Sequence, residues 1–251
     1  MKGFLISILV IFSTLQIYAA AINPDIEAAN KAYAKEKYND AIQLYTKVLD
    51  KGLESYELYY NLGNCYYRIS NFPMAILNYE RGKKLNPADE DLDFNLKIAN
   101  TKIVDKIDPI PQLFFVKWWI LLTNLFSFDY WAYIAIGTIS FFFIFLFVYL
   151  ASATYKIKKL SFWFSNSFLI ITVLCIYFAY NQYSAINDKN AAIIFSPNVT
   201  VKSSPDEKGT DKFVIHEGTK VILLDELNNW VKIKIANGSN GWIEKQTFEI
   251  I

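Results

Sequence analysis

Two uncharged stretches constrain the fold of this chain more than any other feature. The first runs from Tyr130 to Leu150 and the second from Leu160 to Tyr180, 21 residues each. About 20 apolar residues are enough to cross the hydrocarbon core of a membrane as a helix. The sequence therefore predicts a hairpin of two transmembrane helices, 130–150 and 160–180, which helps to explain why 53% of the 251 residues are hydrophobic.

Charged residues near these stretches set the expected orientation. The short loop 151–159 holds Lys156, Lys158 and Lys159 without an acidic partner, and the positive-inside rule places such a loop in the cytoplasm. Residues 1–21 have the basic start, short apolar run and small-residue end of a signal peptide, with an uncleaved anchor as the alternative. Both signals predict that the regions on either side of the hairpin are exported.

The segment 110–129 leads into the first predicted span. Its apolar part, 113–128, contains Lys117 and is too short to cross a membrane comfortably. We expect it to form an amphipathic helix lying in the membrane interface, with Trp118 and Trp119 at the level of the lipid headgroups. The alternative is a third span, which would contradict the orientation derived from the lysines.

The exported region 22–109 contains an internal repeat with a shift of 34 residues. The shift pairs small residues and aromatic residues, among them Ala29 with Gly63, Tyr33 with Tyr67, Ala41 with Ala75 and Tyr45 with Tyr79. This period and pattern are typical of tetratricopeptide repeats, which are pairs of packed helices. A third, partial copy begins at Pro87. The prediction is an all-α solenoid of two repeats and a capping helix.

Such repeats present a concave face that suits an extended peptide. Amide side chains can pair with a peptide backbone, and Tyr and Arg are common binding anchors. The candidates for a peptide-binding groove are Asn30, Tyr33, Asn61, Asn64, Tyr67 and Arg68. The alternative is that the tyrosines only pack and the asparagines are typical of the fold. A clamp for a terminal carboxylate is not expected, because Ile26, Asp91 and Asn95 stand where basic residues would be needed.

After a linker at 181–190, the pattern of residues 191–251 changes to short alternating runs. Apolar residues alternate along 199–201 and 231–235, and turn residues such as Glu217-Gly218 and Asn237-Gly238 divide the runs. This predicts five or so strands closed into a small all-β barrel. The segment resembles a bacterial SH3-like domain, with Trp230 and Trp242 as its marks and as candidates for its binding surface.

The chain is poor in the residues that catalysis and metal binding require. It has one histidine, His216, and its two cysteines fall in different predicted regions, so no disulfide, metal or cofactor site is expected. The adjacent carboxylates Asp225 and Glu226 would point to opposite faces of a strand, which disfavours an enzyme. With 25 basic and 24 acidic residues, the net charge of +1 disfavours nucleic acid as a partner.

The order of these parts resembles the BatE-type proteins of the Bacteroides aerotolerance system. The most specific pieces are KIVDKIDPIPQLFFVKWW, which joins the repeats to the membrane, and the segment from Val199 to Ile251. The resemblance implies a bacterial inner-membrane protein that acts with von Willebrand A-type membrane proteins and a MoxR-type ATPase in oxidative-stress tolerance.

Two hypotheses of function follow. The first is a non-enzymatic scaffold for protein–protein interactions in the periplasm, in contact with membrane lipid. The second is a cell-envelope binding module whose SH3-like domain recognises peptidoglycan or its peptides. The predicted fold class is a multidomain membrane protein with a tetratricopeptide solenoid, a two-helix transmembrane hairpin and an SH3-like barrel.

Overall fold

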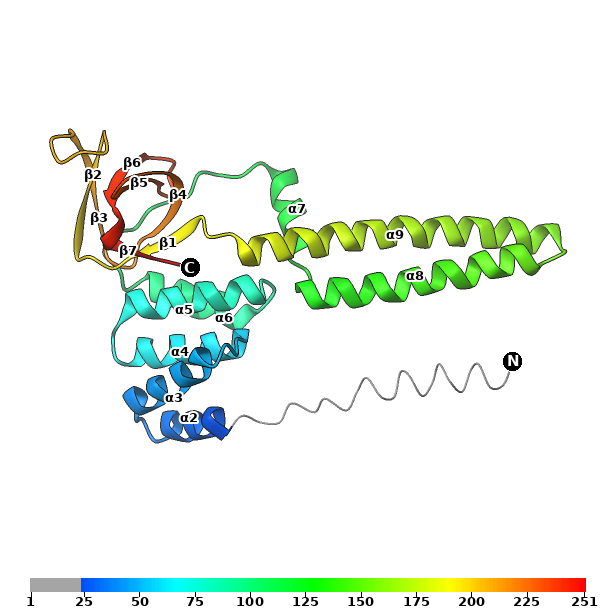
Figure 1. The fold of residues 1–251 in the computed structure, drawn as a ribbon, viewed down its shortest axis with the longest axis horizontal. Helices are drawn as coiled ribbons and strands as arrows, with labels where there is room; N and C mark the ends of the chain where they lie inside the picture. Colours follow the sequence, from blue (N-terminus) through cyan, green and yellow to red (C-terminus); the bar gives the residue numbers. More distant parts are fainter. Residues whose placement is uncertain (1–23) are drawn as a thin grey trace. The chain divides into compact units, whose positions relative to one another are not determined.

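The computed structural model describes residues 24–251, so the predicted signal peptide lies outside the described residues. These residues form two compact units, which divide between Glu54 and Ser55 (Figure 1). The first unit holds one pair of helices. The second holds the remaining helices and all the strands. Each unit is described by itself below.

The first unit is the helix pair α2 (Pro24–Ala34) and α3 (Tyr38–Asp50). Ala29 and Ala41 are fully buried where the two helices pack, and their small side chains allow a close approach. Asp25, near the start of α2, accepts hydrogen bonds from Lys47 (3.0 Å) and Lys51 (2.5 Å), which lie at the end of α3. These ion pairs connect the start of α2 to the end of α3.

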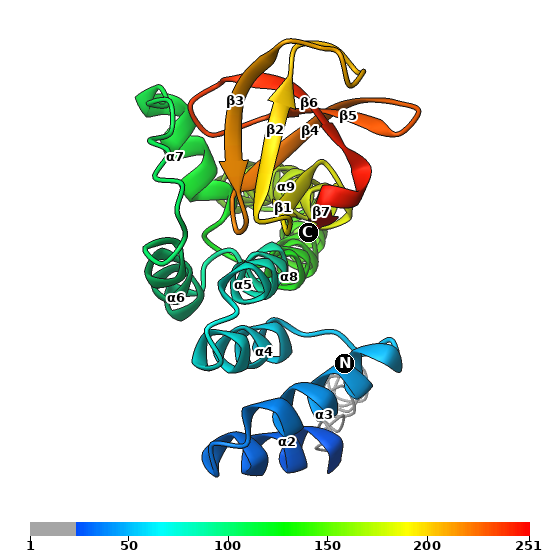
Figure 2. The same ribbon diagram turned by 90° about the vertical axis from the view of Figure 1, so that its left-hand side faces the viewer.

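The second unit begins with three helices, α4 (Tyr56–Arg68), α5 (Phe72–Leu85) and α6 (Glu90–Asn100) (Figures 1 and 2). The residue before each helix caps it: the side chains of Ser55, Asn71 and Asp89 accept hydrogen bonds from backbone N–H groups in the first turn.

Side-chain contacts repeat with the predicted period of 34 residues. In the first copy, the Tyr45 hydroxyl donates to Asn30 (2.5 Å), and in the second the Tyr79 hydroxyl donates to Asn64 (2.8 Å). The turn after the first helix of each pair also contains one left-handed residue: Glu36 (φ 60°) and Ser70 (φ 62°). The predicted helical repeat is confirmed for both copies.

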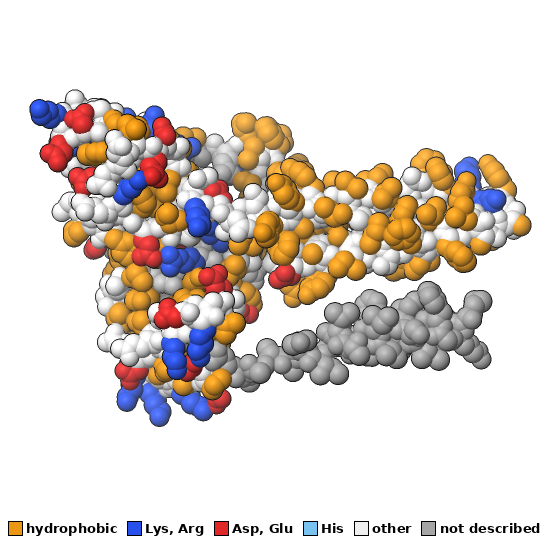
Figure 3. All heavy atoms as spheres, viewed as in Figure 1, with side chains coloured by type: hydrophobic (Ala, Val, Ile, Leu, Met, Phe, Trp, Pro, Cys, Tyr) orange, Lys and Arg blue, Asp and Glu red, His pale blue; other side chains and the backbone are white. Residues whose placement is uncertain are grey.

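The next three helices are α7 (Phe114–Thr123), α8 (Phe128–Ala151) and α9 (Tyr155–Asn187). The last two have the length and apolar composition of membrane spans, as predicted. They pack along small residues of α9 that recur at intervals of three, four or seven positions and so share one face of the helix, namely Ser161, Ser165, Thr172, Cys175 and Ala179. On the face shown in Figure 3, hydrophobic side chains are spread along the whole hairpin, and charged side chains appear only near its two ends.

The helices of the hairpin are longer than the sequence suggested. The lysines expected in the loop 151–159 lie in the first turns of α9, because only residues 152–154 connect the two helices. At the other end, most of the predicted linker 181–190 is helical, since α9 continues to Asn187.

Helix α7 is held at its C-terminal end. The Thr123 carbonyl accepts hydrogen bonds from Trp131 of α8 (3.0 Å) and from Gln182 of α9 (2.9 Å). The Trp119 ring packs against Phe178 of α9. The rest of α7 exposes its apolar side chains, and Trp118 is 68% exposed. With ten residues the helix is too short to span a membrane, and its interfacial position stays a prediction.

The C-terminal region is one antiparallel sheet of seven strands in the order β3-β2-β6-β5-β4-β1-β7, curled into a small barrel. The strands are β1 (Ala191–Ile194), β2 (Asn198–Lys202), β3 (Asp211–His216), β4 (Lys220–Leu227), β5 (Trp230–Lys234), β6 (Asn240–Glu244) and β7 (Phe248–Ile250). The sequence predicted five or so strands, and the excess arises because short strands such as β7 have too few residues to show an alternation. Gly218 (φ 85°) and Gly238 (φ 88°) occupy the predicted turns.

Strand β1 belongs to two cores at once. Successive side chains of a strand point to opposite faces, so Ala192 and Ile194 enter the core of the barrel while Ile193 enters the core that contains Ile76 of α5. These three residues are fully buried. Figures 1 and 2 both show α5 next to β1 and β7. The barrel is therefore packed on the helices α4–α6. The sequence had suggested two separate domains, whereas the structure joins them through a shared core.

Candidate functional site

Four of the predicted groove residues lie on one side of helix α4. Asn61, Asn64 and Arg68 are spaced by three or four residues and share a helix face, and Tyr67 adjoins them. The side-chain oxygen of Asn64, however, accepts hydrogen bonds from Tyr79 (2.8 Å) and from Asn95 of α6 (2.9 Å). Asn64 therefore helps to hold three helices together.

The two remaining groove candidates, Asn30 and Tyr33, lie on α2 in the first unit. Asn30 accepts the hydroxyl of Tyr45, as Asn64 accepts that of Tyr79. The Tyr33 ring packs edge-on against Tyr38 at 5.4 Å, and the Tyr67 ring packs in the same way against Phe72. The side chains of Asn30, Tyr33, Asn64 and Tyr67 thus all make contacts within the repeats.

The helix α6 adds a residue that the sequence did not suggest for this face. Asn95 was considered only as a place where a basic residue was missing, but its amide reaches Asn64 on α4. The partial third copy of the repeat was the signal that could have found it. We call Asn61, Asn64, Tyr67, Arg68 and Asn95 the repeat face.

Cys65, which is next to Asn64 in sequence, is fully buried between the helices. Burial raises the pKa of its thiol to about 12. The thiolate is the nucleophilic form of cysteine, so this side chain acts as a small packing residue.

The two marker tryptophans lie on the outer face of the barrel. Trp230 pairs with Glu244 and Trp242 with Lys232 across β5 and β6, so the two tryptophans are diagonal neighbours on the same face. Trp230 lines a cavity of about 340 Å³, and Trp242 does not. The other lining residues of that cavity are Asn198, Val199, Thr200, Lys202, Glu207, Glu244 and Thr247.

A second cluster joins the barrel to the segment that follows α6, residues 101–110, which we call the strap. The Asp105 carboxylate accepts hydrogen bonds from the Thr219 hydroxyl (2.6 Å) and from the backbone N–H of His216 (2.7 Å), and it lies 2.8 Å from Nδ1 of His216. Farther along, the Ile110 N–H donates to the Ala236 carbonyl (3.2 Å). The strap thus contacts the β3–β4 turn and the end of β5.

The electrostatics of Asp105 reflect two opposing effects. Burial by itself raises the pKa of the carboxyl, but the hydrogen bonds from Thr219 and His216 outweigh it, so the pKa lies below its ordinary value of 3.8. The Thr219 hydroxyl is bonded to the carboxylate and not to the imidazole. The imidazole of His216 is therefore not placed between hydroxyl and carboxylate, as a nucleophilic triad would require.

His216 lies at the end of β3, and its ring is bonded to Asp105. Its partner Asp105 was not predicted, although it falls within the string that carried the family resemblance. Within residues 24–251, no three His, Cys, Asp or Glu side chains come together as a metal site would need.

Comparison with known families matches two segments of the chain. Residues 56–89, which hold α4 and α5, match the tetratricopeptide repeat, and residues 197–249, which hold β2 to β7, match the bacterial SH3 domain. Both are binding modules. Tetratricopeptide repeats typically mediate protein–protein interaction and bacterial SH3 domains typically bind the cell envelope, in both cases without catalysis. No curated protein matches the chain.

Proposed function

We propose that this protein is a non-enzymatic scaffold of the bacterial inner membrane that holds partner proteins together in the periplasm. The observation that carries the proposal is the packing of two binding modules on each other, with a membrane hairpin inserted between them in the chain. Two modules fixed near a membrane raise the effective concentration of each other's partners, so weak contacts suffice.

The contacts between barrel and helices support a single side of the membrane for both modules. Lys220 of the barrel donates to Glu80 of α5 (2.7 Å), and Arg81 of α5 donates to Glu249 of β7 (2.9 Å). Groups joined in this way must lie in the same compartment, which requires an even number of spans between them. The lysines at the start of α9 favour the cytoplasm for the tip of the hairpin, which leaves the modules in the periplasm.

The family resemblance adds a more specific context. In the proposed assembly, the scaffold works with von Willebrand A-type membrane proteins and a MoxR-type ATPase of a Bat-type system linked to oxidative-stress tolerance. The repeat face supplies the contact with a peptide segment of one partner, and the barrel supplies a second contact.

Pull-down of the full-length protein from detergent extracts tests this proposal. We expect partner membrane proteins to be recovered, and the double variant Asn61→Ala/Arg68→Ala to reduce the yield about tenfold, as expected for an anchor of a peptide. Lys97→Ala, an exposed change on a different face of α6, is the matched control. Equal recovery with both variants would refute the role of the repeat face. Asn64 is unsuitable for this test because its loss would also loosen the helices.

The cavity at Trp230 favours a second candidate function, binding of the cell envelope. An exposed cavity that contains an aromatic side chain and several hydrogen-bonding groups suits a sugar or a peptide of the cell wall. Co-sedimentation of the full-length protein with purified sacculi should then be weakened by Trp230→Ala. Absence of the wild-type protein from the pellet would count against this function.

A further inference from the structure

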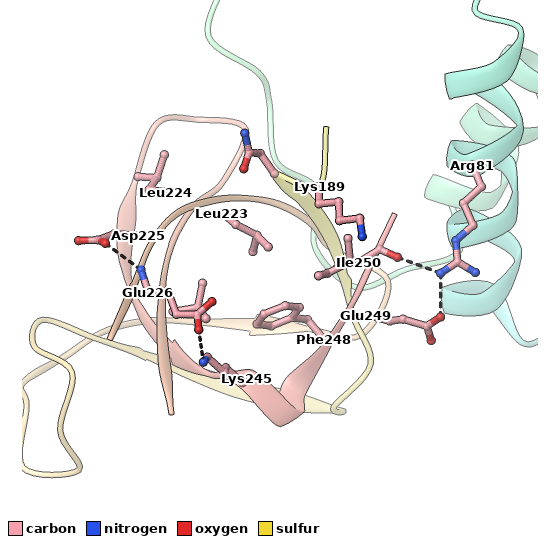
Figure 4. Close-up of a pocket in the computed structure, with 12 residues that line it drawn as sticks. Arg81, Lys189, Leu223, Leu224, Asp225, Glu226, Lys245, Phe248, Glu249 and Ile250 are labelled. Atoms are coloured by element: carbon pink, nitrogen blue, oxygen red, sulfur yellow. Dashed lines mark hydrogen bonds and ion pairs between the residues drawn. The ribbon is translucent and has the colours of Figure 1, made fainter. Parts of the chain in front are cut away.

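Two places in the second unit carry polar groups that have no role in the proposed function. The first is a cavity of about 800 Å³ at the junction between α5 and the barrel. Figure 4 shows two ion pairs at this cavity, Arg81 with Glu249 and Lys245 with Glu226, so these four charges are compensated within the chain. The second place is the outer face of the hairpin, where a side-chain amide keeps unused hydrogen-bonding groups.

Helix α9 has two opposite faces with a similar spacing of residues. The inner face, described above, packs against α8. On the opposite side, a second set of residues is spaced alternately by three and four positions. We call this set the outer seam: Trp163, Asn166, Ile170, Val173 and Tyr177. Its members Trp163, Ile170 and Val173 are between 59% and 62% exposed. The spacing is that of the contact positions of a coiled coil, which lie on one stripe of the helix.

Asn166 is the only residue of the outer seam with an amide side chain. One N–H of this amide donates to the Phe162 carbonyl, one turn earlier in α9 (2.8 Å). An Asn side chain has two N–H donors and an acceptor oxygen. One donor and the oxygen of Asn166 therefore have no hydrogen-bond partner within residues 24–251.

In the topology proposed above, these groups would lie inside the membrane. Asn166 follows Lys159 by seven residues, which is about 10 Å along a helix, and the hydrocarbon core is about 30 Å thick. Lys can extend to the headgroups from below the membrane surface, but the Asn side chain is too short to do so. Lipid tails offer no hydrogen-bond partner, so the amide gains stability from a polar group of another membrane helix.

We propose that the outer seam packs against the outer seam of a second copy of this protein, so that two hairpins pair in the membrane. Copies with the same topology place their α9 helices parallel and their Asn166 side chains at the same depth. The remaining donor of each amide then meets the oxygen of the other, which gives two mutual hydrogen bonds about a two-fold axis. A single polar residue among apolar contact positions fixes the register of such a pair. The proposal rests on the membrane hairpin of the proposed function.

The two ends of the outer seam are compatible with this pairing. Toward the tip of the hairpin, Lys159 continues the stripe, but its flexible ammonium group would lie among headgroups and salt, where like charges repel weakly. At the other end, the Tyr177 ring packs against Trp119 of α7, with 5.9 Å between the ring centroids. The contact between the copies therefore runs mainly from Trp163 to Val173.

Sedimentation equilibrium of the purified full-length protein in density-matched detergent micelles measures the association. We expect a monomer–dimer equilibrium. Asn166→Leu should raise its dissociation constant about tenfold, as the loss of two hydrogen bonds between membrane helices implies, whereas Asn166→Gln keeps a donor and an acceptor and should retain most of the association. A wild-type protein that stays monomeric, or an unchanged constant in Asn166→Leu, would refute the proposal.

Asn187→Leu is the matched control for this measurement. The Asn187 amide makes the same kind of bond, to the Tyr183 carbonyl one turn earlier (2.8 Å), but it lies beyond the predicted span 160–180. We expect its loss to leave the dissociation constant unchanged. An equal effect of Asn187→Leu and Asn166→Leu would assign the change to the helix in general and overturn the role of the seam.

Single cysteine substitutions then locate the contact in native membranes. Val173→Cys, on the seam, should give a disulfide-linked dimer on oxidation with copper phenanthroline. Ile171→Cys lies at nearly the same depth but is turned away from the seam, and it should not, although Ile171 is 42% exposed. The native Cys175 is only 3% exposed, so the wild-type protein is the blank. Crosslinking at Ile171 and not at Val173 would show contact through another face and overturn the assignment.

Carbonate extraction of the same membranes separates this proposal from the one on which it rests. Release of the wild-type protein by carbonate would show that the hairpin is not inserted, and both proposals would fail. Protein that is retained in the membrane but monomeric would refute only the pairing of copies. Crosslinking of Val173→Cys to a different membrane protein would assign the outer seam to that partner and would likewise refute the pairing.

Discussion

At the scale of single residues, the interior of the repeats is set by the ring of Tyr79. A Cβ atom added to Gly63 would lie 2.4 Å from this ring, so only glycine fits there. The ring cannot move away easily, because its hydroxyl is bonded to Asn64 and its side chain is only 2% exposed. Gly63 and Ala75 belong to the small residues of the repeat pattern, and both are buried where α4 and α5 pack closely.

We predict that Gly63→Ala destabilises the protein by about 1–3 kcal/mol, the usual cost of overpacking a well-packed core. The gain in helix propensity from Gly to Ala, about 1 kcal/mol, offsets only part of it. Thermal unfolding followed by circular dichroism measures the change. Gly137→Ala in α8 is the control, since nothing lies within 4 Å of the added atom, and it should be neutral or stabilising. An equal loss in both variants would contradict the packing argument.

At the scale of elements, the strap has no regular secondary structure of its own, yet it fixes the turns of the barrel. Asp105 accepts from both His216 and Thr219, and the Ile103 side chain lies so close to Gly218 that a Cβ there would be 2.4 Å away. The left-handed φ of Gly218 adds a second reason for glycine at this turn.

The strap should release the barrel in acid. Because the pKa of Asp105 is lowered by folding, the carboxylate contributes stability at all pH values above its ordinary pKa of 3.8 and loses it as pH falls through the lower, folded value. We predict protection of the His216 amide from hydrogen exchange between pH 7 and pH 5, and its loss below about pH 4. Asp105→Asn should lower this protection across the whole range, without the acid step. An acid step that persists in the variant would assign it to another group.

At the scale of the whole second unit, strand β1 makes the helices and the barrel one cooperative body. Ile193 is fully buried, but against the helices and not in the core of the barrel. Its neighbours in β1, Ala192 and Ile194, fill the core of the barrel. The charged pair Glu80–Lys220 joins residues 140 positions apart in the sequence. A substitution that destabilises the packing of the helices at this interface should therefore also destabilise the barrel, and the reverse.

We predict that Ile193→Ala destabilises the second unit by about 2–4 kcal/mol, as a large-to-small change in a core does. Hydrogen exchange should increase both in α5 and in β5, although the residue itself belongs to β1. The control is Ile222→Ala on β4, a residue that is 41% exposed, for which a much smaller effect is expected. Faster exchange in the barrel alone would show that the helices and the barrel unfold separately.

The parts of this molecule could be predicted from sequence better than their packing. Three signals extend over many residues: the 34-residue repeat, the alternation of apolar residues and the uncharged stretches of about twenty residues. They correctly indicated helical repeats, strands and span-like helices, respectively. The junction depends on single residues such as Asp105, Ile193 and Arg81, whose partners are distant in the chain. No period marks such contacts, so the core shared by the helices and the barrel could not be foreseen.

The position of the hairpin within the chain has a consequence for synthesis. The helices α4–α6 leave the ribosome first, whereas β1, which covers Ile76 of α5, follows only after both helices of the hairpin. Until β1 has been synthesised, the barrel cannot cover this apolar surface of α5. In the proposed topology, completion of the body formed by the helices and the barrel would therefore report that the hairpin has inserted correctly, and a chain with a misinserted hairpin would leave that surface exposed.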